Sequence, residues 1–246
     1  MKNYYGSLCT EMYEILHKDA PRDEFSFYLS YAEKDMSILE PLCGSGRFFI
    51  PFLKRGYDIQ GIDLSNEMLS ELKVKEPNAN VIQGDILNYN LDKKFDYIFI
   101  TSGSVSLFTD MEICKLILKK MKSLLKKGGR FVFAVDTIAN SSTNDADYKV
   151  SVSVKTKKGY DLVLKNKNYY DKDTQTQFSP SIYELYNGTV RLQQETMDFQ
   201  THLYKPGEME DILYSVGFTE IKVYSSYDKG TERNNQAEMF LYECTF

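Results

Sequence analysis

The sequence predicts an α/β protein with a doubly wound, mostly parallel sheet, and three observations carry that prediction. Short apolar runs, such as 37–40 and 57–62, alternate with segments of helical periodicity, as in repeated β–α units. The first run ends in a tight turn that contains Gly44 and Gly46. The second run ends in a carboxylate, Asp63. Strand ends of this kind meet at the carboxyl edge of a parallel sheet, where such folds bind ligands.

Residues 4–32 precede the first strand and are predicted to form two helices. Pro21 separates them, because proline lacks the N–H that a helix interior requires. Gly56 is typical of a helix C-cap, and Ser65 and Pro77 are typical of the start and stop of the next helix. In order, we expect strand 37–40, helix 47–55, strand 57–62, a helix between Ser65 and Pro77, strands 81–83 and 95–100, helix 110–126 and strand 131–136.

The helix 110–126 has an amphipathic pattern, with an apolar stripe on one side and lysines on the other. A solvated face is the favoured interpretation of the lysines, and a nucleic-acid contact is the alternative. The stripe is predicted to consist of Ile113, Leu116, Ile117, Met121 and Leu124, and the lysine face of Lys115, Lys119, Lys122 and Lys126.

From residue 148 the pattern changes to the alternation of β-strands. Val150, Val152 and Val154 alternate with serine, and turn signals such as Asn187-Gly188 separate the apolar runs. We therefore predict four antiparallel strands, at about 148–157, 160–171, 175–187 and 189–203.

The glycine turn and Asp63 together predict a nucleoside cofactor. Glycines let the backbone approach a ligand, and a carboxylate can accept hydrogen bonds from both ribose hydroxyls. A dinucleotide fingerprint requires a third glycine, but Phe49 stands there, which disfavours NAD. No Gly-Lys-Ser/Thr follows the turn, which excludes a P-loop.

The chain resembles the class I S-adenosylmethionine-dependent methyltransferases. Residues 40–46 resemble the family's first motif, an acid followed by x-G-x-G-x-G, with Leu42 in place of the first glycine, which implies a local adjustment of the loop. Asp63 matches the acid that holds the ribose in that family. Further matches in order are 83–87, 95–100, 124–131 and a tail of helix 208–217, strand 218–224 and a reversed strand 238–244.

That resemblance implies the cofactor contacts. Gly44 and Gly46 would admit the methionine portion, Glu40 would meet its ammonium, and Asp85 with the backbone of Ile86 would meet the adenine. Structural alternatives stay open: Glu40 as a cap of the loop, and Asp85 and Thr101 as turn residues. The predicted cofactor-binding residues are Tyr5, Glu40, Leu42, Gly44, Gly46, Asp63, Leu64, Gly84, Asp85, Ile86 and Thr101.

Fewer residues are predicted to contact the substrate than the cofactor. Methyl transfer from a sulfonium needs positioning and desolvation rather than a catalytic triad. Tyr5 or Tyr13 could place a ring against the sulfonium, or only pack the N-terminal helix. We name Tyr13 and His202 as candidate catalytic residues, with plain packing as the alternative for His202. The sugar N-methyltransferases carry a histidine after the fourth strand, where Leu107 stands here, so no base is evident and an amine acceptor is favoured over an alcohol.

The predicted organisation is a methyltransferase core, 1–147 and 204–246, with a Rossmann-like seven-stranded sheet whose last strand is antiparallel. Residues 1–35 would form a helical lid, and 148–203 an inserted antiparallel β-sheet over the substrate site. This arrangement resembles the sugar N,N-dimethyltransferases and the glycine and sarcosine N-methyltransferases.

Composition limits the partners. The net charge of −5 and the absence of a basic patch or an Asn/Asp-Pro-Pro-Tyr/Phe motif argue against nucleic acid. Apolar runs are too short for a membrane span, no signal peptide is evident, and four scattered cysteines lack metal-ligand spacing, so we expect a cytoplasmic protein without a metal. We expect methyl transfer to a small molecule by a monomer or homodimer. Alternatives are an O-methyltransferase, a protein that binds the cofactor without turnover and, more distantly, an NAD oxidoreductase.

Overall fold

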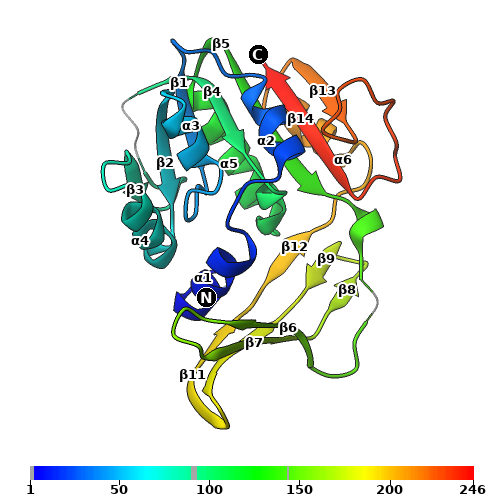
Figure 1. Cartoon of the computed structure of the whole chain (residues 1–246). Coiled ribbons are helices and arrows are strands. Elements are labelled where there is room, and N and C mark those ends of the chain that lie inside the picture. Colours follow the sequence, from blue (N-terminus) through cyan, green and yellow to red (C-terminus); the bar gives the residue numbers. More distant parts are fainter. Residues whose placement is uncertain (1–2, 90–92, 143) are drawn as a thin grey trace.

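A seven-stranded central sheet organises the computed structural model, which describes residues 3–89, 93–142 and 144–246. Its strand order is β13-β14-β5-β4-β1-β2-β3 (Figure 1). The strands β1 to β5 run parallel, whereas β14 is antiparallel to both β5 and β13. This confirms the predicted fold class and its reversed last strand. The strands are β1 Ser37–Pro41, β2 Asp58–Asp63, β3 Val81–Gln83, β4 Phe95–Ile100, β5 Leu125–Asp136, β13 Glu220–Tyr224 and β14 Met239–Thr245.

Helices cover both faces of this sheet (Figure 1). In β5, Phe131 and Phe133 belong to the apolar cluster beneath α5 and α6, whereas Val132 and Ala134 belong to the cluster beneath α2, α3 and α4. Alternate residues of a strand point to opposite faces, so two separate cores result. The helical segments are α1 Ser7–Leu16, α2 Arg22–Leu29, α3 Phe49–Lys54, α4 Asn66–Lys75, the 3₁₀ turn η1 Ser104–Leu107, α5 Met111–Leu124, the 3₁₀ turn η2 Ile138–Asn140 and α6 Glu208–Ser215.

The buried stripe of α5 differs from the predicted one. Ile113 and Leu116 are 43% and 53% exposed. Cys114 and Leu118 take their places in the core, because positions 114, 117, 118 and 121 follow the i, i+3, i+4 spacing of one helix face. Ile113 and Leu116 lie at the boundary between that buried face and the exposed face of the helix.

Between residues 149 and 202 the described chain forms seven strands rather than the four predicted. They make a four-stranded sheet, β11-β10-β7-β6, and a three-stranded sheet, β12-β9-β8. The predicted run 175–187 breaks at Pro180, which has no N–H to donate to a ladder and separates β9 from β10. The strands are β6 Lys149–Lys155, β7 Asp161–Asn166, β8 Tyr169–Asp171, β9 Thr176–Phe178, β10 Ser181–Asn187, β11 Val190–Met197 and β12 Gln200–His202.

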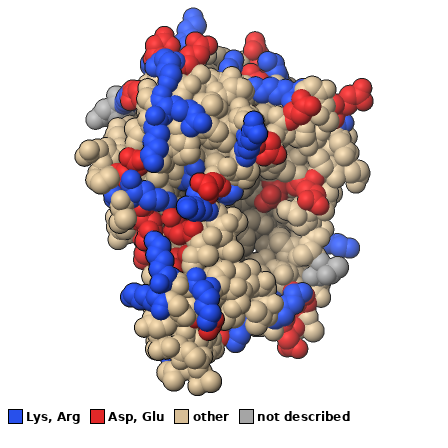
Figure 2. All heavy atoms as spheres, viewed as in Figure 1, with Lys and Arg blue, Asp and Glu red and all other residues tan. Residues whose placement is uncertain are grey.

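The helix α1 packs on the four-stranded sheet, and its apolar side chains form a third cluster with side chains of β7, β10 and β11. The Glu195 carboxylate on β11 accepts hydrogen bonds from the backbone N–H groups of Leu8 (3.0 Å) and Cys9 (3.3 Å). It therefore caps α1 from another element, satisfying N–H groups that a helix start leaves unpaired. In the space-filling view, the molecule is hollowed between the central-sheet part and the part built from β6 to β12, and acidic side chains gather beside that hollow (Figure 2).

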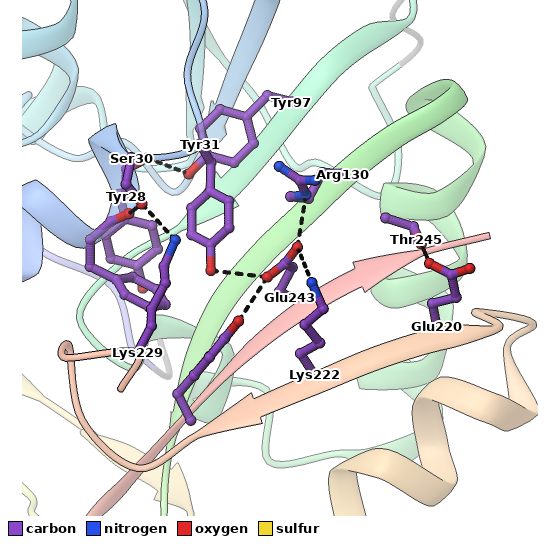
Figure 3. A network of polar contacts seen from close by, with 12 residues as sticks. Tyr28, Ser30, Tyr31, Tyr97, Arg130, Glu220, Lys222, Lys229, Glu243 and Thr245 are labelled. Carbon is purple, nitrogen blue, oxygen red and sulfur yellow. Dashed lines mark hydrogen bonds and ion pairs between the residues drawn. The ribbon is translucent and has the colours of Figure 1, made fainter. Parts of the chain in front are cut away.

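A polar network attaches α2 and the loop after β13 to the sheet (Figure 3). Glu243 on β14 accepts hydrogen bonds from the hydroxyl groups of Tyr31 (3.2 Å) and Tyr224 (3.0 Å). It also pairs with Arg130 (3.1 Å) and Lys222 (3.4 Å). A carboxylate that is only 7% exposed thus has its charge compensated on several sides, which holds the outer strands and α2 in one arrangement.

Candidate functional site

A cavity of about 490 Å³ lies at the carboxyl ends of β1, β2 and β4 and is covered by α1. Its volume is in the range of small-molecule sites. Eight predicted site residues line it, together with several that the sequence did not single out. The lining residues are Asn3, Tyr4, Tyr5, Tyr13, His17, Glu40, Leu42, Cys43, Gly44, Arg47, Phe48, Asp63, Leu64, Ser65, Met68, Thr101, Ser102, Ser104, Leu107 and Phe108.

The loop after β1 approaches the cavity in a conformation that suits glycine. Gly44 and Gly46 have φ values of +50° and +86°. Leu42, in place of the family's first glycine, has a φ of +58°, a left-handed conformation that costs an ordinary residue about 1–2 kcal/mol. The loop therefore keeps its glycine-like path at the expense of strain in Leu42. Gly46 does not line the cavity, and a Cβ there would lie 2.9 Å from the Leu72 Cγ, so its place is in helix packing.

Asp63, at the end of β2, joins the loops that follow β1 and β2. Its Oδ2 accepts a hydrogen bond from the Gly44 N–H (2.8 Å), and its Oδ1 accepts one from the Ser65 N–H (2.9 Å). Burial raises the pKa of Asp63, although these backbone hydrogen bonds oppose that shift. Each carboxylate oxygen keeps a lone pair for a further donor. The arrangement fits a pair of ligand hydroxyl groups at this strand end.

Glu40, at the end of β1, is the least satisfied group in the cavity wall. It is 2% exposed, and its Oε2 has no hydrogen-bond partner among the described residues. Burial, with smaller contributions from Asp63 and Glu24, raises the pKa of Glu40 well above its ordinary value. A buried carboxylate oxygen without a donor is unfavourable unless a ligand supplies one. The residues present therefore fit a ligand that carries an ammonium beside a diol.

Aromatic side chains of the N-terminal segment cover the cavity. The rings of Tyr5 and Tyr13 meet edge to face with centroids 6.3 Å apart, and His17 lies 4.9 Å from Tyr13. Burial raises the pKa of both tyrosines, so they stay neutral. Burial, followed by the charge of Arg47, lowers the pKa of His17. Two neutral tyrosine rings thus cover the cavity that the glycine loop borders.

The loop after β4 forms the opposite wall. Thr101 and Ser102 both line the cavity, and Ser102 has a φ of +55°. The Glu24 carboxylate on α2 accepts hydrogen bonds from the Ser102 N–H (2.8 Å) and Oγ (3.1 Å). Burial raises the pKa of Glu24, which is 5% exposed. The second helix therefore fixes the backbone of this wall.

The predicted adenine residues lie outside the residues that line this cavity. Asp85 accepts hydrogen bonds from the Leu87 N–H (3.0 Å) and the Asn88 side chain (2.7 Å), as in the turn role that the sequence left open. Ile86 is buried in the core, and a Cβ on Gly84 would lie 3.0 Å from the Tyr89 ring. The adenine contact of these three residues stays a prediction. Leu64, by contrast, lines the cavity and is 48% exposed.

The structure does not bring His202 to the cavity. Its Nε2 lies 3.0 Å from Glu208 Oε1 and 3.1 Å from Gln175 Nε2, and its ring packs on Tyr204 at 4.6 Å. With an exposure of only 4%, His202 links β12 to α6. This geometry supports the packing alternative rather than the catalytic one.

Sequence reasoning missed Arg47 and His17 at the cavity and Glu24 behind it. Arg47 directly follows the second glycine of the loop, so its place at the ligand end of a helix was a usable signal. No local pattern marked Glu24 or His17, because their positions depend on how the N-terminal helices fold back over the sheet.

Comparisons with known proteins find similar domains and structures. Residues 38–129 match the model of a methyltransferase domain. Among structures, an S-adenosylmethionine-dependent methyltransferase from Clostridium acetobutylicum is similar, with a TM-score of 0.78, 19% identity and 96% of both chains covered. The sugar N-methyltransferase KedS8 from Streptoalloteichus has a TM-score of 0.73 and 17% identity, covering 100% of this chain and 96% of that one. The chain thus has the fold of these methyltransferase structures, and residues 38–129 are similar to a methyltransferase domain.

Two curated relatives are similar over part of the chain. A malonyl-[acyl-carrier protein] O-methyltransferase of Ilyobacter polytropus is 33% identical over 46% of this chain and 42% of its own length. The dTDP-3-amino-3,4,6-trideoxy-alpha-D-glucopyranose N,N-dimethyltransferase of Streptomyces venezuelae is 29% identical over 38% of this chain and 39% of its own length. The matches thus span less than half of these relatives. Among the described residues, no helix is both long and apolar enough to cross a membrane.

Proposed function

We propose that this protein transfers a methyl group from S-adenosylmethionine to the amine nitrogen of a small molecule. The observation that carries the proposal is the pairing of Glu40 and Asp63 at the ends of neighbouring strands, β1 and β2, on one cavity. An unpartnered buried carboxylate suits the amino group of the methionine portion. A carboxylate already fixed by two backbone N–H groups suits the ribose diol.

The chain's own residues would bind, orient and desolvate. When bound, S-adenosylmethionine supplies a methyl group on a sulfonium that is already activated as a leaving group. Glu40 would hold its amino group and Asp63 its ribose, and the glycine loop would let the backbone lie against it. Tyr5 and Tyr13 would exclude water and offer ring faces to the positive charge, a contribution of about 1 kcal/mol. Leu42, Leu64 and Thr101 would complete the cofactor walls, with Tyr13 nearest to the acceptor.

A nitrogen acceptor is favoured because a neutral amine attacks without a base. The similarity to sugar N-methyltransferase structures and to an amino-sugar N,N-dimethyltransferase supports a small amine acceptor. One observation favours O-methylation as a second candidate: the His17 imidazole, which lines the cavity and whose pKa is lowered, could take the proton of an alcohol. Binding without turnover remains the third possibility.

The first test is calorimetric titration with S-adenosylhomocysteine, with NAD as the control. We expect S-adenosylhomocysteine to bind with a Kd of about 1 μM, near −8 kcal/mol, and NAD not to bind. Binding of NAD alone would overturn the cofactor assignment. If S-adenosylhomocysteine binds, matched amines and alcohols are then offered with S-adenosylmethionine. Methylated amine supports the proposal, methylated alcohol supports the second candidate, and no product with either leaves a protein that only binds the cofactor.

The proposal includes a small-molecule acceptor rather than nucleic acid or a membrane, and a monomeric or homodimeric chain. Light scattering during size-exclusion chromatography tests the oligomeric state. A cytoplasmic location is supported by the four cysteines, which are all free and buried. The division into a core, 1–147 and 204–246, with a lid at 1–35 and an inserted subdomain at 148–203 is likewise proposed, supported by the separate sheets in the latter segment.

A further inference from the structure

Asp136 is an acidic residue at the carboxyl end of β5 that the cofactor contacts do not use. It follows Val135, which faces α5 and α6, so its side chain lies on the opposite face, the one that α2 covers. Its neighbour across the sheet is Met239 on β14. Asp136 therefore stands at the edge where this fold binds ligands.

The Asp136 carboxylate has no hydrogen bond and no ion pair among the described residues. Only its backbone is engaged: the N–H donates to Ser106 Oγ (2.8 Å), and the carbonyl accepts from the Tyr204 N–H (2.9 Å). Burial alone raises the pKa of this carboxyl to about 6. An unpaired, largely desolvated carboxylate is costly, so a missing partner is the natural explanation.

Asp136 adjoins the wall of the cofactor cavity. A Cβ on Gly103 would lie only 3.0 Å from Asp136 Oδ1, so the carboxylate rests directly against this glycine, whose φ is +67°. The residues on either side, Ser102 and Ser104, line the cavity. The backbone of Gly103, which has no side chain, is therefore what lies between the Asp136 carboxylate and the cavity lined by Ser102 and Ser104.

A second hollow of about 930 Å³ lies between α2 and the loop that follows β13, and neighbours of Asp136 across the sheet line it. The cross-strand neighbour Met239 lines this hollow, and the Thr137 N–H donates to the carbonyl of Glu238, which also lines it. The hollow is rich in hydroxyl groups and acids: Asp23, Ser26, Ser30, Ser225, Ser226, Asp228 and Glu238. Lys229 is the one basic side chain among its lining residues.

We propose that Asp136 contacts the amino group of the acceptor and receives its proton. This inference rests on the proposed function and names the acceptor's reacting group as a primary or secondary amine. The neutral nitrogen attacks the methyl carbon, the carbon–sulfur bond breaks, and its electron pair stays on sulfur as a thioether. The product nitrogen, now an ammonium, passes one N–H proton to the Asp136 carboxylate, which releases it to solvent.

The other acids at this edge already have partners or a proposed one. Glu24 accepts two hydrogen bonds from Ser102. Asp63 is held by two backbone N–H groups, and Glu40 faces the cofactor cavity. Glu40 also lacks a partner, but it is assigned to the cofactor, so Asp136, which lies against the Gly103 loop and beside Met239, is the acid left for the acceptor.

The test uses the full chain saturated with S-adenosylhomocysteine. It is titrated with two amines, 3-amino-3-deoxyglucose and benzylamine, and with their hydroxyl counterparts, glucose and benzyl alcohol. We expect at least one amine to bind, and Asp136→Asn to weaken its binding about tenfold or more, as for loss of a charge-assisted hydrogen bond. Asp136→Glu keeps the charge and should bind the amine more tightly than Asp136→Asn. Asp35→Asn, an exposed acid just before β1 at the opposite edge of the sheet, is the matched control and should change nothing.

Affinity for S-adenosylhomocysteine separates the two proposals. Suppose that every variant binds S-adenosylhomocysteine normally. If Asp136→Asn then binds the amine as tightly as the unchanged protein does, the role of Asp136 is overturned. Failure of both amines to bind overturns it as well. If S-adenosylhomocysteine does not bind to the unchanged protein, the proposed function itself is overturned. Methyl transfer to the amine that binds, with a raised KM in Asp136→Asn, would support the contact directly.

Discussion

The Glu195 carboxylate occupies the space that a side chain on Gly6 would need. A Cβ on Gly6 would lie 2.5 Å from Glu195 Oε1, the same group that caps the first turn of α1. Gly6 does not have a left-handed backbone, so it is demanded by this close approach and not by its dihedral angles. The position of the N-terminal helix α1 thus depends on Gly6 and on the Glu195 carboxylate, which is distant in the sequence.

Gly6→Ala should therefore displace Glu195 and loosen α1. Loss of the cap should cost about 1 kcal/mol of stability. Affinity for S-adenosylhomocysteine should fall as well, because Tyr5 and Tyr13 cover the cavity from this segment. Urea unfolding and calorimetry measure the two effects. Gly159→Ala, at an open turn, serves as a control for replacing a glycine elsewhere. Unchanged affinity in Gly6→Ala would show that the lid does not contribute to binding.

Asp63→Ala should weaken S-adenosylhomocysteine binding about a hundredfold, because it removes both the diol acceptor and the anchor of the glycine loop. Asp58→Ala, at the other end of the same strand, removes only an exposed pair with Lys93 and should leave affinity unchanged. Circular dichroism checks that both variants fold. A folded Asp63→Ala protein with normal affinity for S-adenosylhomocysteine would contradict the assignment of Asp63 to the ribose.

Glu40→Gln should separate stability from binding. Without ligand, the variant should be more stable than the unchanged protein, because an unpaired buried carboxylate is removed. With S-adenosylhomocysteine, it should bind more weakly, because the ammonium loses its counter-charge.

The pH dependence of binding adds a check on Glu40. In the ligand-free protein the pKa of Glu40 lies well above its ordinary value of 4.5. The carboxyl is therefore protonated at pH values between 4.5 and that raised pKa. The affinity for S-adenosylhomocysteine should rise as pH increases and the carboxyl ionises. In Glu40→Gln that rise should be reduced. Parallel pH curves for the two proteins would contradict the assignment.

Leu42 offers a test of backbone strain. At an ordinary position, alanine is more stable than glycine, because glycine loses more freedom on folding. At a φ of +58° the order should invert, with Leu42→Gly more stable than Leu42→Ala by about 1 kcal/mol. Chemical denaturation of both variants measures the difference. If the alanine variant proves the more stable, the loop must relax out of the left-handed conformation.

Asp136 should make the protein less stable as pH rises. Its pKa is raised from 3.8 to about 6 in the folded state, so folding favours the protonated form. That contribution is complete below pH 3.8, and up to about 3 kcal/mol is lost as pH rises through 6. Asp136→Asn should therefore be more stable than the unchanged protein at neutral pH. The difference between the two stability curves isolates this residue from other buried acids, and a difference independent of pH would refute the shift.

Much of the fold was predictable because local signals and tertiary packing agree. The strands Val81–Gln83 and Phe95–Ile100 have the predicted bounds, and Ser65 caps α4 by accepting the Met68 N–H. The predictions that were wrong lie where context decides. Three of the four runs predicted in 148–203 are each divided in two, and at one of these breaks Pro180 interrupts a run that alternation alone makes continuous.

The candidate site was predictable along β1 and β2 but not across the chain. Glu40, Gly44 and Asp63 stand at strand ends that a parallel sheet brings together, so sequence order was sufficient. Glu24 and Asp136 come from α2 and β5 and meet the same loop only after the whole sheet forms. Their unusual environments, in particular the absence of a partner for the Asp136 carboxylate, are properties of packing that no motif records.

Thr137 and Tyr204 form a parallel bridge at the place where the chain leaves and rejoins the central sheet. The Ile138 N–H donates to the Tyr204 carbonyl (3.1 Å), so the two crossing points touch. The segment between them is a module that leaves and rejoins the central sheet at this one place, while α1 packs on it from the N-terminal segment. A change in the length or content of that module would leave the spacing of the core strands unaltered. Under the proposed function, a change in this module could alter the preferred acceptor while Glu40, Gly44 and Asp63 stay in place.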